Sequence, residues 1–301
     1  MQKTKSWVGA MRLRTLPLSL SGIILGAGVA YHNGFWDTTI FVLAISTTIL
    51  FQVLSNFAND LGDSAKGTDN SERIGPMRSV QSGVISQSEM KFAVIVVAVL
   101  SLISAAALIF VGVKGMPEQI LWFYIGLAIL CIVAAITYTV GKKAYGYHGM
   151  GDIMVFIFFG LVSVLGVYSL FAKSFLMENV SLGIFVGLLS TAVLNLNNMR
   201  DYKNDAASNK KTIVVKMGPN NAKFYHALLI LIALLSLTIF LNSFKKPELF
   251  FTMVPAILLI IHLRKVMKTT QVKDFDPELK KVALTTFLIS ICVVVGLILT
   301  R

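Results

Sequence analysis

The sequence predicts an all-α integral membrane protein, a single bundle of nine transmembrane helices. Hydrophobic residues make up 55% of the 301 residues and charged residues only 14%, whereas roughly 25% of the residues of a soluble domain are charged. The mean hydropathy is +0.75. The apolar residues are gathered into runs long enough to cross the ~30 Å hydrocarbon core of a bilayer. We therefore expect residues 1–301 to form one transmembrane domain.

Short polar segments separate the apolar runs, and each run is expected to form one helix. The expected spans are residues 16–31, 38–58, 92–113, 120–140, 153–171, 180–199, 222–241, 249–263 and 282–300. A signal peptide is a weaker interpretation of the first run, because eight further apolar runs follow it.

The basic residues indicate how the helices are oriented. With a cytoplasmic N-terminus, 22 of the 27 Lys and Arg residues fall in cytoplasmic segments. Such an excess is typical of cytoplasmic loops, and it accounts for the net charge of +12 without nucleic acid as a partner. These loops are also the long ones and hold most of the acids, so the active site is expected on the cytoplasmic side of the bundle.

Ionisable residues stand at the exit of the second span, where an apolar border makes them costly. On a helix, Asn56, Asp60 and Asp63 lie at i, i+4 and i+7, so an amide and two carboxylates share one face. The segment that follows adds Lys66, Asp69, Arg73 and Arg78. A solvated connector does not need acids at helical spacing. The pattern favours a Mg²⁺ site for a phosphorylated ligand, with arginines binding phosphate oxygens.

A second motif stands at the same depth, at the exit of the sixth span. Asn197, Asp201 and Asp205 lie at i, i+4 and i+8 and share a helical face. The recurrence suggests two four-helix units arranged as parallel repeats, which commonly share a site at their interface. Two acidic faces that meet would hold two Mg²⁺ ions bridged by a diphosphate. Lys210 and Lys211 follow, and for Lys211 ordinary positive-inside charge explains the residue equally well.

These motifs resemble those of the UbiA superfamily of intramembrane prenyltransferases. The aspartate-rich strings are Asn59-Asp60-Leu61-Gly62-Asp63 and Asp201-Tyr202-Lys203-Asn204-Asp205. Longer strings are similar to the 1,4-dihydroxy-2-naphthoate prenyltransferase (MenA) branch of that superfamily. They are Arg14-Thr15-Leu16-Pro17, the stretch from Asn59 to Asp69, Arg73-Ile74-Gly75-Pro76 with Arg78, and Asn197-Asn198 with Arg200-Asp201.

The resemblance implies transfer of a polyprenyl group from polyprenyl diphosphate to 1,4-dihydroxy-2-naphthoate, with loss of CO₂, in a bacterial cytoplasmic (inner) membrane. The lipid of that membrane would surround the prenyl tail. Asp60, Asp63, Asp201 and Asp205 are implied to be catalytic, and these four with Asp69 to bind Mg²⁺, as two ions. The implied substrate-binding residues are Asn56, Asn59, Lys66, Arg73, Arg78, Tyr138, Lys142, Asn197, Asn198, Arg200 and Lys210.

Two positions depart from the superfamily pattern. Gly67 stands where a further acid is often found, and the acid is delayed to Asp69, which puts the metal role of Asp69 in doubt. Asn209 stands where a glycine is expected before Lys210, which weakens the interpretation of that segment as a phosphate-binding loop.

The loop after the fourth span, residues 138–152, is rich in glycine but lacks a dinucleotide-binding pattern. Tyr138 and Lys142 are expected either to contact the substrates or to anchor the interface. His148 has a suitable reference pKa for a base, but a lone loop histidine more often has no chemical role. Asp152 stands at a helix start, where an acid is favoured in any case.

Two other functions fit parts of this pattern. A related prenyltransferase could act on another aromatic acceptor. A transporter could use intramembrane carboxylates to bind a cation or an anionic solute. The acids of a transporter should line a path to both sides of the membrane, whereas these acids stand at one side only.

The orientation is testable by cysteine labelling. We expect single cysteines at Ser71, Ser208 and Lys245, in a chain lacking Cys131 and Cys292, to be labelled by an impermeant maleimide in intact cells only at position 245. Labelling of all three after the membrane is opened is the control. Labelling at 71 or 208 but not 245 would invert the orientation, and labelling of 71 and 208 from opposite sides would rule out a shared site.

Overall fold

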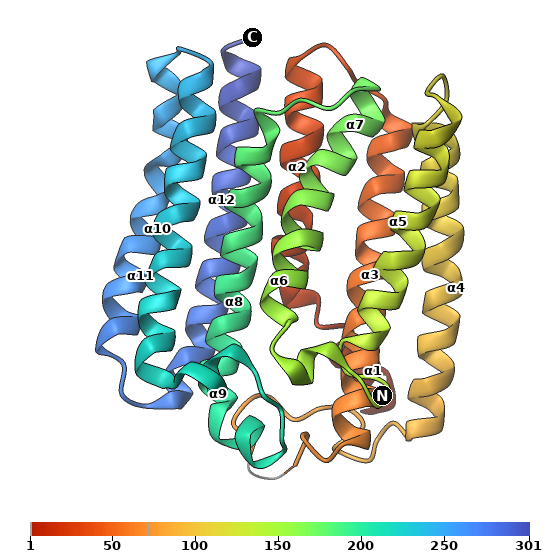
Figure 1. The fold of residues 1–301 in the computed structure, drawn as a ribbon, viewed down its shortest axis with the longest axis vertical. Coiled ribbons are helices and arrows are strands. Elements are labelled where there is room, and N and C mark those ends of the chain that lie inside the picture. The colour runs from red at the N-terminus through yellow and green to blue at the C-terminus, as the bar shows by residue number, and fades with distance from the viewer. Residues whose placement is uncertain (1, 71–72) are drawn as a thin grey trace.

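The computed structural model describes residues 2–70 and 73–301 and shows a bundle of long helices (Figure 1). The long α-helices are α2 (Leu16–His32), α3 (Thr38–Ala65), α4 (Gln87–Gly112), α5 (Glu118–Thr137), α8 (Asn179–Ala207), α10 (Pro219–Ser243) and α12 (Asp276–Leu299). Within the described residues there is no strand, and nine helical segments are long and apolar enough to cross a membrane. The predicted all-α class and number of spans are confirmed. Ser71, one of the labelling positions above, lies outside the described residues.

Two of the nine spans contain none of these long α-helices and are built from shorter segments. The fifth consists of α6 (Gly151–Val155), a π-helical segment (Phe156–Gly166) and α7 (Val167–Ala172). The eighth consists of a 3₁₀ segment (Pro247–Ala256) and α11 (Ile257–Lys268). Pro255 lies inside the eighth span. Because proline has no N–H and its ring clashes with the preceding turn, it disrupts regular α-helical winding there.

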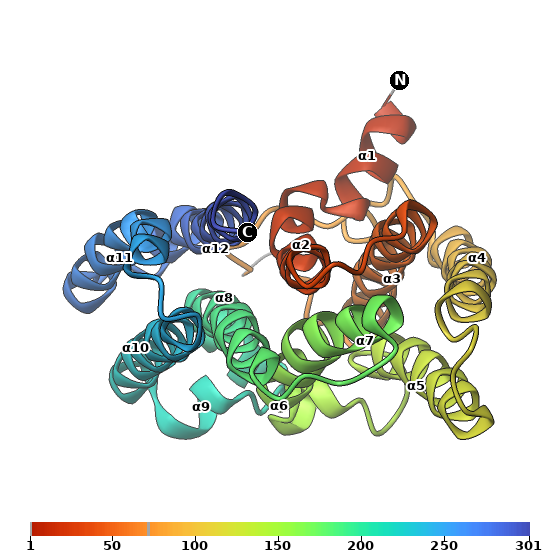
Figure 2. The same ribbon diagram turned by 90° about the horizontal axis from the view of Figure 1, so that it is seen from above.

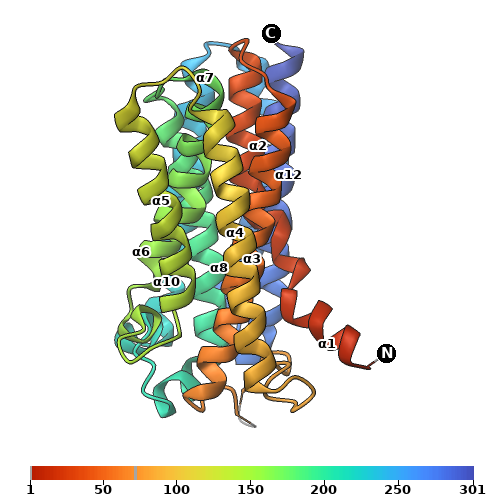
Figure 3. The same ribbon diagram turned by 90° about the vertical axis from the view of Figure 1, so that its right-hand side faces the viewer.

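Short helical segments lie outside the long helices. They are α1 (Gln2–Met11), α9 (Ile213–Met217) and the 3₁₀ turns Leu13–Thr15, Tyr145–His148 and Val272–Phe275. Figure 3 shows α1 leaving the side of the bundle at an angle to α2. The break between α1 and α2 falls at Arg12, whose backbone is left-handed, with φ 48° and ψ 52°.

The helices that carry the two motifs extend past the expected ends of their spans. Hydropathy placed those ends at residues 58 and 199, but α3 continues to Ala65 and α8 to Ala207. Both helices run in the same direction, so their C-terminal ends meet at one end of the bundle (Figure 1). Seen from above (Figure 2), α8 lies between α10 and the composite fifth span, and it packs against both.

Glycines bring α8 very close to the π-helical segment. A Cβ atom added to Gly160 would lie 2.6 Å from Cα of Gly187, and real Cβ atoms essentially never approach backbone so closely. The carbonyl oxygen of Gly183 would lie 2.4 Å from the same Cβ atom. Both neighbours are backbone atoms, which cannot rotate away as a side chain can. The fifth span and α8 are therefore held at a separation that only glycine permits.

We expect Gly160→Ala to lower the apparent melting temperature of the purified protein, because overpacking typically costs about 1–3 kcal/mol. Gly126→Ala in α5 is the matched control, since a Cβ there meets nothing within 4 Å, and alanine favours a helix over glycine. Differential scanning fluorimetry in detergent measures both. Equal melting temperatures for the two variants would show that the close packing of α8 against the π-helical segment does not contribute to stability.

Candidate active site

The two acidic motifs meet at one end of the bundle. Asp60 and Asp63 lie on the last turns of α3, and Asp201 and Asp205 on the corresponding part of α8; each is at most 5% exposed. A hydrogen bond from the Asn204 amide to the Thr68 carbonyl oxygen, 2.8 Å long, ties the α8 motif to the segment after α3. Residues more than 130 positions apart thus form one site.

Two cations connect the motifs directly. Arg73 Nε lies 3.3 Å from Asp69 Oδ1, and Arg73 Nη2 lies 3.6 Å from Asp201 Oδ2. Lys210 Nζ lies 3.5 Å from Asp63 and 3.9 Å from Asp205. Each of these side chains therefore pairs with one acid on the α3 side and one on the α8 side.

Two further arginines pair with the same acids. Arg78 lies 3.5 Å from Asp63 and 3.4 Å from Asp69. Arg200, which is 1% exposed, donates to Asp201 Oδ2 at 2.6 Å and to Asp276 at the start of α12. A guanidinium group has five donors in a planar fork, so it can satisfy several acceptors at once.

In this cluster, burial disfavours the charged form of each side chain, and opposite charges nearby favour it. Burial and the nearby Asp63 charge raise the pKa of the Asp69 carboxyl to about 7. Burial opposes the charged form of Lys210, but the carboxylates of Asp63 and Asp205 outweigh burial and raise the Lys210 pKa. The lysine therefore stays charged, whereas Asp69 is held near its point of ionisation.

Several carboxylate oxygens have no hydrogen-bond partner among residues 2–70 and 73–301. They are Asp60 Oδ1 and both oxygens of Asp69, although Asp69 still has its two arginines within 3.4 Å. Buried oxygens of this kind are ligands for hard cations such as Mg²⁺, which typically takes one or two carboxylates and completes its shell with water and phosphate. The donor set fits Mg²⁺ on that basis. Across residues 2–70 and 73–301, no three acid, histidine or cysteine side chains are grouped closely enough to hold one ion together.

Tyr147 belongs to the site, although no sequence pattern selected it. Its hydroxyl donates to Asp63 Oδ1 at 2.8 Å and contacts the Thr68 hydroxyl at 2.5 Å. Lys66 Nζ lies 3.9 Å from the centre of the Tyr147 ring. Burial and the Asp63 charge raise the pKa of the Tyr147 hydroxyl, so it remains a hydrogen-bond donor.

The structure separates two predicted substrate-binding residues from the main pocket. Lys66 and Lys142 are exposed and border a second, shallow depression beside Gly62 and Thr139. Lys142 therefore lies outside the described lining of the main pocket, and its contact with the substrates stays a prediction. His148 is exposed as well, and its carbonyl oxygen accepts a hydrogen bond from Lys216 Nζ.

The predicted amides and Tyr138 lie around the acids. Asn56 donates to the Met11 carbonyl oxygen at 2.9 Å, and Asn59 accepts from Thr139 at 3.2 Å. Asn197 accepts from Arg200 at 2.8 Å, Asn198 is 4% exposed, and Tyr138 packs against Tyr145. Asn56, Asn59, Asn197 and Tyr138 line the main pocket.

Asn209 adopts the backbone conformation that a glycine at this position would supply. Its φ is +55°, in the left-handed region that glycine favours and asparagine tolerates. The backbone turn before Lys210 is therefore made without glycine. Lys210 reaches both acidic motifs.

A pocket of about 410 Å³ begins at this cluster and runs into the bundle. Its polar end includes Asp63, Arg78 and Lys210. Its remaining walls are mostly apolar, from residues such as Phe51, Ile109, Phe158, Phe159 and Leu170. Asp60, Asp69, Asp201 and Asp205 are not among the described residues that line the pocket. The pocket suits an amphiphile with an anionic head and a long apolar tail.

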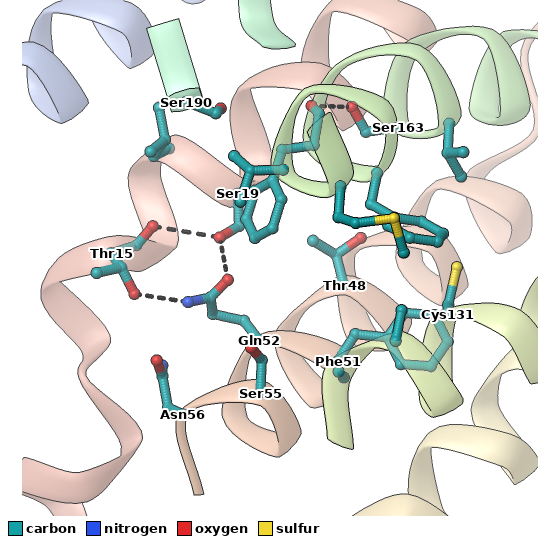
Figure 4. Close-up of a pocket in the computed structure, with 18 of the residues that line it drawn as sticks. Thr15, Ser19, Thr48, Phe51, Gln52, Ser55, Asn56, Cys131, Ser163 and Ser190 are labelled. Atoms are coloured by element: carbon teal, nitrogen blue, oxygen red, sulfur yellow. Dashed lines mark hydrogen bonds between the residues drawn. The ribbon is translucent and has the colours of Figure 1, made fainter. Parts of the chain in front are cut away.

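A small polar group interrupts the apolar wall (Figure 4). Ser19 on α2 donates to the Gln52 side-chain oxygen at 2.7 Å, and the Gln52 amide donates to Thr15 Oγ1 at 2.9 Å. Arg12 lines the pocket nearby. Its left-handed backbone costs roughly 1–2 kcal/mol for a residue other than glycine. No pattern in the sequence analysis selected Arg12.

Comparison with known proteins agrees with this geometry. The chain is 40% identical to a 1,4-dihydroxy-2-naphthoate octaprenyltransferase of Escherichia coli (strain K12), covering 99% of this chain and 97% of that protein. It is 40% identical to the protein of that name from Haemophilus influenzae over 99% and 97% of the two chains.

Solved structures share the fold. A UbiA homologue from Aeropyrum pernix K1 superposes with a TM-score of 0.68 at 14% identity, over 96% of this chain and 98% of that one. A homologue from Archaeoglobus fulgidus, bound to DMAPP and Mg²⁺, superposes with a TM-score of 0.60 at 17% identity, over 93% and 98%. Residues 19–297 match the UbiA prenyltransferase family, and the chain belongs to that family.

Proposed function

We propose that the chain transfers a polyprenyl group from polyprenyl diphosphate to 1,4-dihydroxy-2-naphthoate, forming demethylmenaquinol. The observation that carries this proposal is the pairing of two buried acidic motifs with an apolar pocket at one end of a membrane bundle. The relatives of that name at 40% identity support the choice of acceptor. A transporter, and a prenyltransferase for another acceptor, have no comparable support.

The polar end of the pocket would bind the diphosphate. Mg²⁺ held by Asp60 with Asp63 and by Asp201 with Asp205, one ion at each motif, would supply Lewis-acid stabilisation of the leaving group. Arg78 and Lys210 line this end and have N–H donors for phosphate oxygens. Tyr147 keeps the Asp63 carboxylate in place through its hydrogen bond.

C2 of the acceptor carries the carboxylate and no hydrogen, so the reaction needs no base to remove a proton from C2. The bond between the allylic carbon and the diphosphate oxygen breaks, and its electron pair leaves with the diphosphate. C2 of the acceptor then bonds to the allylic carbon. The bond from C2 to the carboxylate breaks, its electron pair returns to the ring, and CO₂ leaves. Phe51, Phe158 and Phe159 line the pocket, would exclude water, and would stabilise the allylic cation by cation–π attraction.

We also propose that the site opens to the cytoplasm. The basic residues are concentrated at the end of the bundle that holds the acids, as the positive-inside rule requires. The N-terminus then lies in the cytoplasm, and the membrane is the bacterial inner membrane. Both substrates would reach the polar end from the cytoplasm, and the prenyl tail would lie among the helices and the lipid.

Removing one metal-directed charge should abolish turnover. We expect Asp60→Asn or Asp201→Asn to lower kcat by about 10²-fold or more, the size of a lost electrostatic contribution to the transition state. Asp37→Asn is the matched control, since Asp37 caps the opposite end of α3 and asparagine caps equally well. A radiolabelled prenyl-transfer assay at saturating Mg²⁺ measures all three. Activity of either site variant within about threefold of wild type would exclude the two-motif site.

Mg²⁺ and the prenyl diphosphate should bind cooperatively. Carboxylates give Mg²⁺ an incomplete shell that phosphate oxygens complete, so each ligand must raise the affinity of the other by the same factor. Calorimetric titration of Mg²⁺, with and without a non-hydrolysable diphosphate analogue, measures that factor. Identical Mg²⁺ affinities in the two titrations would contradict the shared site.

A further inference from the structure

Arg12 is an unpaired cation in the wall of the pocket. The other arginines of the site, Arg73, Arg78 and Arg200, each pair with two acids. Arg12 makes no ion pair with any described residue, and its Nη2 atom is buried without a hydrogen-bond partner. A buried guanidinium nitrogen without an acceptor is costly. This nitrogen is therefore available to an anion that enters the pocket.

The backbone around Arg12 is fixed by hydrogen bonds. The Arg12 N–H donates to the Gly9 carbonyl oxygen at 3.1 Å. The Arg12 carbonyl oxygen accepts from both the backbone N–H and the hydroxyl of Thr15, each at 2.9 Å. These bonds hold Arg12 in its left-handed conformation at the break between α1 and α2.

The polar group in Figure 4 extends this support into the neighbouring helix. Thr15 Oγ1 donates to Arg12 and accepts from the Gln52 amide, and Gln52 in turn accepts from Ser19. The chain of bonds joins α2 and α3 and includes the Arg12 carbonyl oxygen. The Thr15 hydroxyl bonds to both the Gln52 amide and the Arg12 carbonyl oxygen, and so these two side chains hold the Arg12 backbone in place. Neither bonds to the Arg12 guanidinium, which remains available as a donor.

The anion that suits Arg12 is a carboxylate on an aromatic ring. The diphosphate already has Arg78, Lys210 and the metal-directed acids at the polar end. Arg12 lies within electrostatic range of Asp60 and Asp63, and it shares the pocket with Phe51 and Phe158. A planar guanidinium matches a carboxylate through two parallel hydrogen bonds. An aromatic acid held there would lie between the metal-directed acids and the apolar walls.

We propose that Arg12 binds the carboxylate of the aromatic acceptor and selects acceptors that carry one. This inference rests on the proposed function, because 1,4-dihydroxy-2-naphthoate has a carboxylate on the carbon that is prenylated. The binding would orient that carbon toward the allylic carbon of the prenyl diphosphate. Thr15 and Gln52 act as positioning residues through Arg12.

The test compares two ligands that differ only in the carboxylate. 1-Hydroxy-2-naphthoate and 1-naphthol are titrated calorimetrically into protein in nanodiscs, with Mg²⁺ and a non-hydrolysable prenyl diphosphate analogue. We expect Arg12→Gln to lower the affinity for 1-hydroxy-2-naphthoate by about 10- to 100-fold, the loss typical of a hydrogen bond to a charged group. The affinity for 1-naphthol should not change. The affinity of Arg12→Lys for 1-hydroxy-2-naphthoate should lie between those of wild type and Arg12→Gln, since lysine keeps the charge but lacks the planar pair of N–H donors.

Arg14→Gln is the matched control, because Arg14 lines the same pocket two residues away but is exposed. It should leave the preference for 1-hydroxy-2-naphthoate over 1-naphthol at the wild-type ratio. An unchanged ratio in Arg12→Gln, or a loss confined to Arg14→Gln, would overturn the assignment. Weaker binding of the diphosphate analogue by Arg12→Gln would assign Arg12 to the diphosphate instead. Unaltered 1-naphthol binding shows that the variant is folded.

The same titrations separate this inference from the proposed function. If wild type prefers 1-hydroxy-2-naphthoate and Arg12→Gln keeps that preference, the acceptor class stands and the role of Arg12 is wrong. If wild type shows no preference and does not prenylate 1,4-dihydroxy-2-naphthoate, the proposed acceptor is wrong, and the inference fails with it.

Discussion

The structure depends on the neutralisation of four buried aspartates, Asp63, Asp69, Asp201 and Asp205, at the end of an apolar bundle. A buried carboxylate is strongly unfavourable unless it is paired and hydrogen-bonded. Here the pairing is internal, because Arg73 and Lys210 each reach one acid from α3 or the segment after it and one from α8. The carboxylates of the two motifs would repel one another, but the cations between them attract both and hold the motifs together. The long pocket begins where these ion pairs end.

Much of the fold follows from the sequence because hydrophobicity dominates in a membrane. Nine apolar runs gave nine spans, since each span must satisfy its backbone hydrogen bonds within itself. Hydropathy did not find the true ends of α3 and α8, because the helices continue through polar residues that a hydropathy scale excludes. The π-helical winding of residues 156–166, which pack against α8, also lacks a sequence signal.

The acids of the site were predictable, but their surroundings were not. Helical spacing placed Asp60 with Asp63 and Asp201 with Asp205 on common faces, and the structure brings the two faces together. Arg12 and Tyr147 contribute through loop conformations that have no periodic pattern, so spacing could not identify them. Lys142 shows the opposite case: a basic residue in the expected loop whose side chain lies outside the main pocket.

The position of the charges also bears on how the chain enters the membrane. The acids and their basic partners lie at the same end of the bundle, beyond the apolar parts of α3 and α8. If that end is cytoplasmic, none of these groups has to cross the hydrocarbon core during insertion, where a single charge near the centre costs about 2.5–3.5 kcal/mol on translocon scales. Each helix can enter the bilayer with its acids still in water. The ion pairs between α3 and α8 can then form last, when the second half of the chain has been made.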